Sequence, residues 1–253
     1  YYEHVVMTKS LTLVGENRNT TIIDGSGTGL VIRSNASDVE IRGFTVQNGG
    51  YFANGSILLG SCVRNTIRDC IVGNSGFGIE LHESNDSAIV GNIILNNAWA
   101  GIRVVDSSNN EIRKNVIVNN SLGVWITSDL SLLNTLCYNS FIDNKVQAAD
   151  FATTTRWDNG AGKGNYWSDY TGVDDGSGNR TADDGVGDTL LPHSGLDYYP
   201  LMEPWRLIGD VNKDGIVDKS DVILILINAG RVPPKPRKCD INKDSSVNVL
   251  DLI

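Results

Sequence analysis

The chain has 253 residues, of which 40% are hydrophobic and 20% charged, and its formal net charge is −9 at pH 7, as expected of an ordered, soluble protein with one extended core and a small second domain. The acidic balance argues against a nucleic-acid partner, because phosphate binding needs a basic patch, and it favours bound cations instead. No run of 18 apolar residues is present, so the sequence contains no candidate membrane span.

A repeat of about 23 residues organises the first 150 residues. Residues 1–29 are expected to form a first, irregular coil, and residues 30–150 about five more. One apolar position recurs at Ile41, Ile67, Ile89, Ile112 and Leu136, and a second recurs five residues later at Val46, Val72, Ile94, Ile117 and Phe141. A fixed period of this length predicts a solenoid in which each coil stacks on its neighbour.

Asparagine recurs in two further columns. The first contains Asn48, Asn74, Asn96, Asn119 and Asp143, seven residues after the first apolar position, and the second contains Asn92, Asn115 and Asn139, three residues after it. Strands of stacked coils lie roughly 4.8 Å apart, so amides at equivalent turns can hydrogen-bond along the stack. Both columns are therefore expected to form asparagine ladders.

A further strand in each coil is indicated at residues 57–59, 79–81, 102–104 and 124–126, where the residue between two apolar ones faces outward. Three short strands per coil predict an all-β solenoid, namely a right-handed parallel β-helix of about six coils. A leucine-rich repeat of similar length would need its own Leu and Asn spacing and a helix in each repeat, and the sequence shows neither.

The period is lost over residues 151–206, which are rich in Trp, Tyr, Gly and Asp. We interpret this segment as an aromatic, acidic cap on the solenoid, since an open end would expose apolar core and unpaired strand edges. All six prolines lie at or beyond Pro192, outside the expected ladder-forming strands. The cap contains Asp174, Asp184 and Asp188 in VDDGSGNRTADDGVGD, which is either a third calcium site or a solvated acidic loop.

Three motifs follow the Asn-rich coils: GNYWSDY at 164–170, DGVGDTLL at 184–191 and DYYPLMEPW at 197–205. With the coils, they resemble the β-helix family that includes the periplasmic accessory protein of nitrous-oxide reductase copper-site assembly (NosD-like), which has a pectin-lyase-like repeat fold. The resemblance covers about residues 1–205 and implies a fold rather than an activity, since members differ widely in role. Copper is weakly indicated, because the three His and two Met residues form no recognisable ligand set.

The strongest chemical signal lies in residues 207–253, where two loops alternate oxygen-bearing residues as calcium requires. The first loop, DVNKDGIVDKSD, supplies Asp210, Asn212, Asp214, the carbonyl of Ile216, Asp218 and Asp221; the second, DINKDSSVNVLD, supplies Asp240, Asn242, Asp244, the carbonyl of Ser246, Asn248 and Asp251. Gly215 provides the sharp turn of the first loop, whereas Ser245 replaces that glycine in the second and predicts weaker binding. We predict two Ca²⁺ sites.

These tandem loops resemble the dockerin type I module, a pair of calcium loops and helices that binds cohesin modules. The resemblance implies a small α-helical EF-hand domain and a protein partner, either a cohesin-like module or another copy of this chain. Partner choice in dockerins depends largely on loop positions 10 and 11. Here Lys219 and Ser220 differ from Val249 and Leu250, which argues against a two-fold-symmetric binding mode.

The outward positions of the further strand are Leu58, Glu80, Arg103 and Trp125. Many parallel β-helices are polysaccharide lyases or hydrolases, whose chemistry needs converging carboxylates or a metal–carboxylate cluster beside a base. Glu80 beside Arg103 is better explained as a cross-strand ion pair, and Trp125 is available to stack on a sugar or a protein, or to pack under the cap. We predict no catalytic residue, and take Glu80, Arg103 and Trp125 as the face for a polysaccharide or partner.

Covalent features suggest an extracellular or cell-surface location. Acceptor sequons occur at Asn19, Asn35, Asn54, Asn85, Asn119 and Asn179, although chance explains several in so Asn-rich a chain. Tyr1 in place of an initiator Met indicates a processed secreted chain or a fragment. Four cysteines permit three pairings, of which we expect Cys62 with Cys70 and Cys137 with Cys239; alternatively, Cys70 is simply a small buried residue.

These observations predict a secreted, non-catalytic β-solenoid that attaches or self-assembles through a calcium-stabilised module, forming a head-to-tail filament or a surface array. The alternative is a carbohydrate-active enzyme, or a polysaccharide-binding protein, displayed through the same module.

Overall fold

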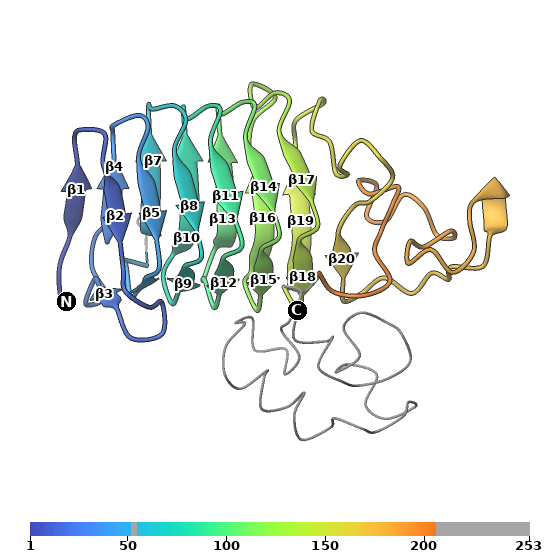
Figure 1. Cartoon of the computed structure of the whole chain (residues 1–253), viewed down its shortest axis with the longest axis horizontal. Coiled ribbons are helices and arrows are strands. Elements are labelled where there is room, and N and C mark those ends of the chain that lie inside the picture. The colour runs from blue at the N-terminus through green and yellow to red at the C-terminus, as the bar shows by residue number, and fades with distance from the viewer. Residues whose placement is uncertain (52–54, 206–253) are drawn as a thin grey trace, which may run out of the picture. The chain divides into compact units, whose positions relative to one another are not determined.

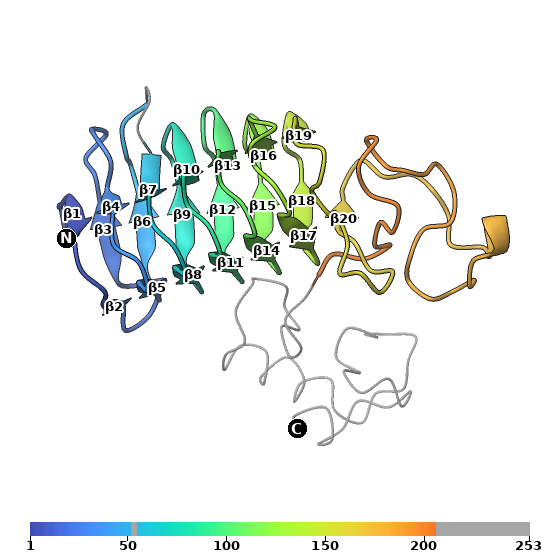
Figure 2. The same cartoon turned by 90° about the horizontal axis from the view of Figure 1, so that it is seen from above.

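The computed structural model describes residues 1–51 and 55–205, which form an all-β parallel solenoid (Figures 1 and 2). The expected fold class is confirmed for this part of the chain. The stack has about seven turns rather than six. The additional turn runs from β19 to β20 and so continues past residue 150, where the predicted solenoid ended. In the second sheet this turn contributes only an isolated bridge, between Thr135 and Arg156. This irregularity explains why the sequence period fades there.

Three parallel sheets make up the solenoid, and each coil contributes one strand to each sheet, except that the last coil has only the isolated bridge in the second sheet. The first sheet contains β1 (Val5–Met7), β4 (Ile32–Ser34), β7 (Gly55–Gly60), β10 (Phe77–His82), β13 (Ala100–Val105), β16 (Leu122–Ile126) and β19 (Val146–Asp150). The second contains β2 (Thr12–Val14), β5 (Glu40–Arg42), β8 (Thr66–Arg68), β11 (Ala88–Val90), β14 (Glu111–Arg113) and β17 (Thr135–Cys137). The third contains β3 (Ile22–Asp24), β6 (Thr45–Gln47), β9 (Ile71–Gly73), β12 (Ile93–Leu95), β15 (Val116–Val118), β18 (Ser140–Ile142) and β20 (Tyr166–Trp167).

Both predicted apolar columns line the core. Ile41, Ile67, Ile89, Ile112 and Leu136 are paired in register along the second sheet, and Val46, Val72, Ile94, Ile117 and Phe141 along the third. All ten side chains are fully buried. The further strand predicted in each coil is also confirmed, within β7, β10, β13 and β16. Identical inward positions thus repeat along the whole stack.

Residues with left-handed backbone conformation make the corners between sheets, and Asn48, Asn74, Asn96, Asn119 and Asp143 form one such column, with φ between 49° and 56°. This column was predicted to be a ladder. Along it, however, the structure shows a side-chain hydrogen bond only from Asn119 Nδ2 to Asn96 Oδ1, at 2.7 Å. The interior ladder lies one residue later, at Ser75, Asn97, Asn120 and Asn144. The left-handed residue turns the chain, so the next side chain points inward.

The second predicted column is a ladder, and it extends one rung further than expected. Asn92 donates to Asn115, Asn115 to Asn139, and Asn139 to Asn165, with Nδ2 to Oδ1 distances of 3.1, 3.0 and 2.9 Å. Each of these amides also donates to a backbone carbonyl of the preceding coil. We call this set the corner ladder. It satisfies buried polar groups where the backbone leaves the sheets.

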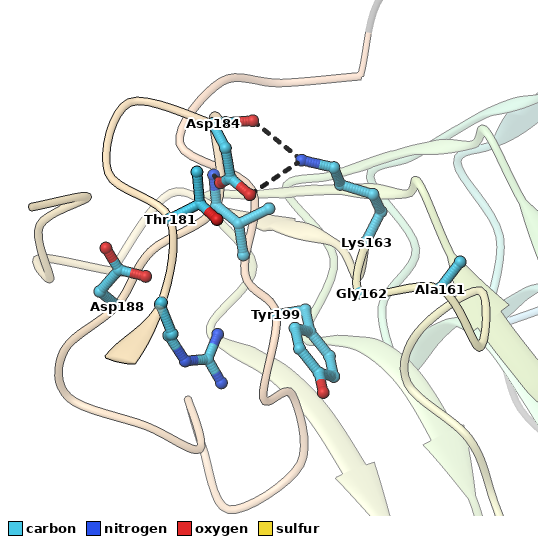
Figure 3. Close-up of a pocket in the computed structure, with 9 residues that line it drawn as sticks. Ala161, Gly162, Lys163, Thr181, Asp184, Asp188 and Tyr199 are labelled. Carbon is cyan, nitrogen blue, oxygen red and sulfur yellow. Dashed lines mark hydrogen bonds and ion pairs between the residues drawn. The ribbon is translucent and has the colours of Figure 1, made fainter. Parts of the chain in front are cut away.

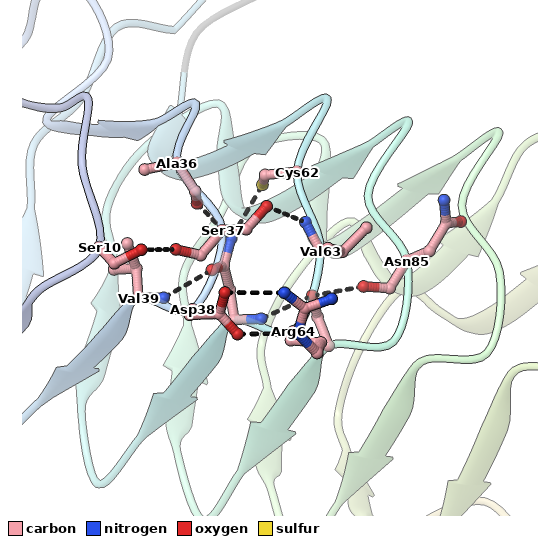
Figure 4. A network of polar contacts seen from close by, with 11 residues as sticks. Ser10, Ala36, Ser37, Asp38, Val39, Cys62, Val63, Arg64 and Asn85 are labelled. Carbon is pink, nitrogen blue, oxygen red and sulfur yellow. Dashed lines mark hydrogen bonds and ion pairs between the residues drawn. The ribbon is translucent and has the colours of Figure 1, made fainter.

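The corner between the first and second sheets carries further polar columns, and part of it is shown in Figure 4. Buried Ser84, Ser107 and Ser131 are linked there, because the backbone N–H of Ser84 donates to the Ser107 hydroxyl and that of Ser107 to the Ser131 hydroxyl. At the surface, Arg64 binds both carboxylate oxygens of Asp38 at 2.8 Å. The corner is therefore polar inside as well as outside.

Residues 151–205 close the C-terminal end of the core. The ring of Trp167 stacks on Phe141 with a centroid distance of 4.3 Å, and the ring of Trp157 lies 5.7 Å from that of Trp167. Both indoles are almost fully buried. The segment is mostly irregular, with one 3₁₀ helix, η1 (Ser177–Asn179). Within residues 1–51 and 55–205, the structure contains no helix with the length and apolar character needed to cross a bilayer.

Asp197 completes the end of the corner ladder. Its Oδ2 accepts the backbone N–H of Asn165 at 2.8 Å, just as the Oδ1 of Asn165 accepts that of Asn139 at 3.0 Å. The same carboxylate accepts Trp167 Nε1 at 2.9 Å and the N–H of Tyr199 at 2.8 Å. Asp197 has no exposed surface, and burial raises the pKa of its carboxyl, an effect that these hydrogen bonds partly offset. A carboxylate thus replaces the asparagine of the next coil.

Candidate functional site

The outward residues of the first sheet offer the most varied chemistry on the solenoid. In register from β1 to β19 they are Val6, Arg33, Leu58, Glu80, Arg103, Trp125 and Ala149. We call this set the outer row. Its members alternate with buried core residues, so the strand period alone directs them outward. The three residues that the sequence singled out are neighbours in the row, on β10, β13 and β16.

Glu80 and Arg103 form the predicted cross-strand ion pair. Arg103 Nη1 lies 3.1 Å from Glu80 Oε2, and the two side chains are 29% and 18% exposed, respectively. They are paired directly across β10 and β13. Because the pair is partly shielded from water, its attraction is screened less than that of a fully exposed pair.

The Arg103 guanidinium also lies between two aromatic rings. Its carbon is 5.0 Å from the centre of the Phe77 ring and 5.3 Å from that of the Trp125 ring. Both distances are within the range of cation–π attraction. Trp125 therefore contacts a neighbouring side chain of its own sheet. Sequence reasoning missed Phe77, because it stands at the edge of β10, outside the inward–outward alternation that revealed the other residues.

The outer row contains a single carboxylate, that of Glu80, and it is neutralised by Arg103. Glycoside hydrolysis requires two carboxyl groups about 5 to 10 Å apart, one of which must be able to donate a proton. The geometry of this row instead suits contact with another surface, through the rings and the partly exposed ion pair.

The third calcium site considered for Asp174, Asp184 and Asp188 in the acidic loop of the cap stays a prediction. Asp174 and Asp188 each accept a backbone N–H of the loop, from Gly185 at 2.7 Å and from Gly176 at 2.6 Å. Asp184 accepts the N–H of Val186 and faces the Lys163 ammonium, 3.7 Å away (Figure 3). Each of the three carboxylates thus accepts one loop N–H, while the other oxygen of Asp174, Oδ1, is buried without a hydrogen-bond partner among the described residues. Throughout residues 1–51 and 55–205, no group of three or more His, Cys, Asp or Glu side chains is placed to hold a metal ion.

The two calcium loops, residues 210–221 and 240–251, lie outside the described residues, as do Asn54 and Cys239. Among the other sequons, Asn19, Asn35, Asn119 and Asn179 are exposed and Asn85 is half-buried. The use of these sequons stays a prediction.

The expected Cys62–Cys70 disulfide is wrong, since both are free, buried thiols. They occupy different corners, separated by the whole of β8. Cys62 contacts the hydroxyl of Ser84 at 3.2 Å, whereas Cys70 replaces asparagine in the corner ladder and donates its N–H to Asn92. Cys137 is also a free thiol. Burial raises the pKa of both Cys70 and Cys137 to about 11, which keeps these thiols protonated at neutral pH.

The stacked coils and the closed end define the class of protein. It is a parallel β-solenoid whose core is capped at the C-terminal end. A family model described as "Periplasmic copper-binding protein (NosD)" matches residues 5–172. The chain therefore belongs to the NosD family, and the resemblance seen in the sequence is confirmed for the β-helix. The family description is periplasmic, which agrees at a coarse level with the expected location outside the cytoplasm. No curated protein matches the chain.

The residues described do not fit the copper of the family description. His4 contacts the carbonyl of Leu30 at 2.6 Å, and His193 pairs with Asp169 at 3.1 Å, while His82 is an exposed residue at the end of β10. Met7 is buried in the core. Copper requires imidazole, thiolate or thioether ligands that converge on one point, and among the described residues no group of three or more His, Cys, Asp or Glu side chains does so.

Proposed function

We propose that this chain is a non-catalytic β-solenoid that acts outside the cytoplasm as a rigid spacer, and that it attaches to a partner through two calcium loops at residues 210–221 and 240–251. The observation that carries the non-catalytic part is the outer row, in which the one carboxylate is paired and the neighbouring guanidinium is held between two rings. A surface of this kind can contact a partner, but it lacks the pair of groups that general acid–base catalysis needs, one to donate a proton and one to accept it.

The rigidity of the spacer rests on the ladders. Buried amides join successive coils at every corner, so each coil is fixed to the next by side-chain as well as strand hydrogen bonds. Repeat proteins gain stability from such nearest-neighbour interfaces. A solenoid of this construction holds its two ends at a fixed separation.

The attachment rests on the calcium-loop spacing in the sequence, which places six oxygen donors in each loop at the positions that calcium uses. Its resemblance to dockerin favours a protein partner, either a cohesin-like module or a second copy of this chain. A heterologous contact, in which the calcium loops of one copy bind a different surface of the next copy, would produce a head-to-tail filament.

Calcium titration of the full chain tests the proposal. Calorimetry should detect two bound Ca²⁺ ions, and the double variant Asp210→Ala, Asp240→Ala should lose both, because position 1 of each loop is removed. The matched control is Asp183→Ala, which changes an exposed aspartate of the cap loop. It should leave binding unchanged.

Light scattering with calcium, and then with EGTA, tests self-assembly in the same preparations. Larger species that form with calcium and dissolve with EGTA support attachment to a second copy. A monomer in both conditions leaves the cohesin-like partner, which is tested by calcium-dependent capture on an immobilised cohesin module. Absence of calcium binding in the wild-type chain contradicts the proposal.

The alternative, a carbohydrate-active enzyme displayed through the same loops, predicts turnover of a polysaccharide that is lost in Glu80→Gln. Binding without turnover would favour a polysaccharide-binding protein instead.

A further inference from the structure

The corner between the third and first sheets exposes two large aromatic rings that lie beside each other. Trp99 is 42% exposed and Tyr51 is 54% exposed, and their ring centres are 6.1 Å apart with a 57° tilt. Trp99 Nε1 donates to the Tyr51 carbonyl at 3.1 Å, and its backbone N–H donates to Gly76 at 2.9 Å. The indole is thus fixed in place while much of its face remains exposed to water, which is how rings are presented at binding surfaces.

Tyr51, whose ring lies beside that of Trp99, also lines a cavity of about 340 Å³. Its lining comprises Gly27, Gly49, Tyr51, Asn74, Ser75, Asn96 and Ala98. None of these residues is charged, in a chain whose net charge is −9. The volume is at the small end of the range for ligand pockets. A metal ion or an anion would find no opposite charge here, so the ligand should be neutral.

The asparagines of the cavity provide unused hydrogen-bonding groups. Asn74 and Asn96 have left-handed backbones, with φ of 54° and 56°. Asn119 donates to Oδ1 of Asn96 at 2.7 Å, which fixes the orientation of that amide and leaves its N–H donors without a partner among the described residues. Amides repeated along the stack therefore line the same cavity as Tyr51, whose ring lies beside that of Trp99.

We propose that this corner is a binding subsite for a neutral saccharide, formed by Tyr51, Trp99, Asn74 and Asn96. The C–H face of a sugar ring packs on aromatic rings, and its hydroxyl groups exchange hydrogen bonds with side-chain amides. The subsite is separate from the outer row and from the calcium loops. It adds ligand binding to the proposed spacer, and it does not depend on that proposal.

Affinity electrophoresis of the full chain tests the subsite. The probes are gels containing mixed-linkage β-glucan or galactomannan, both neutral, and a gel containing anionic polygalacturonate. One of the neutral gels should retard the wild-type chain. Trp99→Ala should weaken that binding at least tenfold, a loss of about 1.4 kcal/mol, because it removes the stacking surface. Trp99→Phe keeps a ring and should restore part of the retardation.

Two further variants keep the test falsifiable. Asn96→Gly preserves the left-handed turn and should reduce retardation even if Trp99→Ala folds poorly. The control is Tyr198→Ala, which removes an exposed aromatic ring of the cap and should leave retardation unchanged. Loss in Tyr198→Ala with retention in Trp99→Ala would overturn the proposal, as would retardation by polygalacturonate alone or by no gel. EGTA in the gel separates this subsite from the calcium loops, since retardation should persist in its presence.

Discussion

The coils and the cap solve one problem in two ways, namely how to satisfy buried polar groups where the chain leaves a sheet. In the coils, each asparagine of the corner ladder binds its equivalent in the next coil, so a single residue type serves at every level. In the cap, the single residue Asp197 accepts N–H groups from three residues, namely Asn165, Trp167 and Tyr199. Repetition makes the coils recognisable in sequence, whereas the cap depends on one residue that no period reveals.

Asn115→Asp, in the corner ladder, should lower the stability of the protein more than any other substitution considered. An asparagine in the middle of the ladder donates to Ile89 and Asn139 as well as accepting from Asn92. A carboxylate at that position would face two acceptors and carry a buried, unpaired charge. We expect a loss of roughly 5 kcal/mol, enough to prevent folding of a marginally stable domain. Urea unfolding, or the recovery of soluble protein, measures this loss of stability. Near-wild-type stability would show that the ladder tolerates a carboxylate in place of an amide.

Asp197→Ala should be the next largest effect. It leaves the N–H groups of Asn165 and Tyr199 and the indole of Trp167 without their acceptor. Unsatisfied buried donors cost about 1 to 3 kcal/mol each when their partner is removed, and relaxation of the cap should reduce the sum to about 3 kcal/mol. Asp129→Ala, at an exposed loop position, is the control for urea unfolding. Equal stability of the two variants would show that Asp197 does not stabilise the end of the corner ladder.

The pH dependence of stability distinguishes the two kinds of rung. Burial raises the pKa of Asp197 above the ordinary 3.8, so its protonated form is favoured more in the folded than in the unfolded chain. The resulting stabilisation is complete below pH 3.8 and is lost as the pH rises through the folded pKa. Asp197→Asn should abolish this trend. Urea unfolding from about pH 3 to pH 6 measures this pH dependence. Parallel plots of stability against pH for the variant and the wild type would refute the prediction.

Cys70→Asn should have the smallest effect, and it should be a gain. Cys70 takes the place of an asparagine at the start of the corner ladder, with its sulfur 3.9 Å from the carbonyl of Ile41. Asn92 Oδ1 already accepts its N–H at 3.0 Å, so an amide there would add two donors to existing acceptors. We expect stabilisation of about 1 kcal/mol in thermal or urea unfolding. A net loss would show that the larger side chain overpacks this corner.

The sequence predicted what repeats. The two apolar columns and the corner ladder were identified because each recurs at one spacing, and the Glu80–Arg103 pair followed from strand alternation. The exposed Asn column was placed one residue away from the interior ladder, because the turn residue and the ladder residue are both asparagine. Asp197 joins Asn165 across 32 residues, and Tyr51 meets Trp99 across 48; neither contact has a periodic signal.

The central claim is that the coils and the cap form one continuous rod, closed by Asp197, whose rigidity the proposed spacer role requires. Hydrogen exchange in the wild type and in Asp197→Ala tests this most directly. The backbone N–H groups of Asn92, Asn115, Asn139 and Asn165 are the reporters. The account predicts that the variant loses most protection at Asn165 and Asn139, less at Asn115 and least at Asn92. Equal loss at all four, or no loss at Asn165, would contradict it.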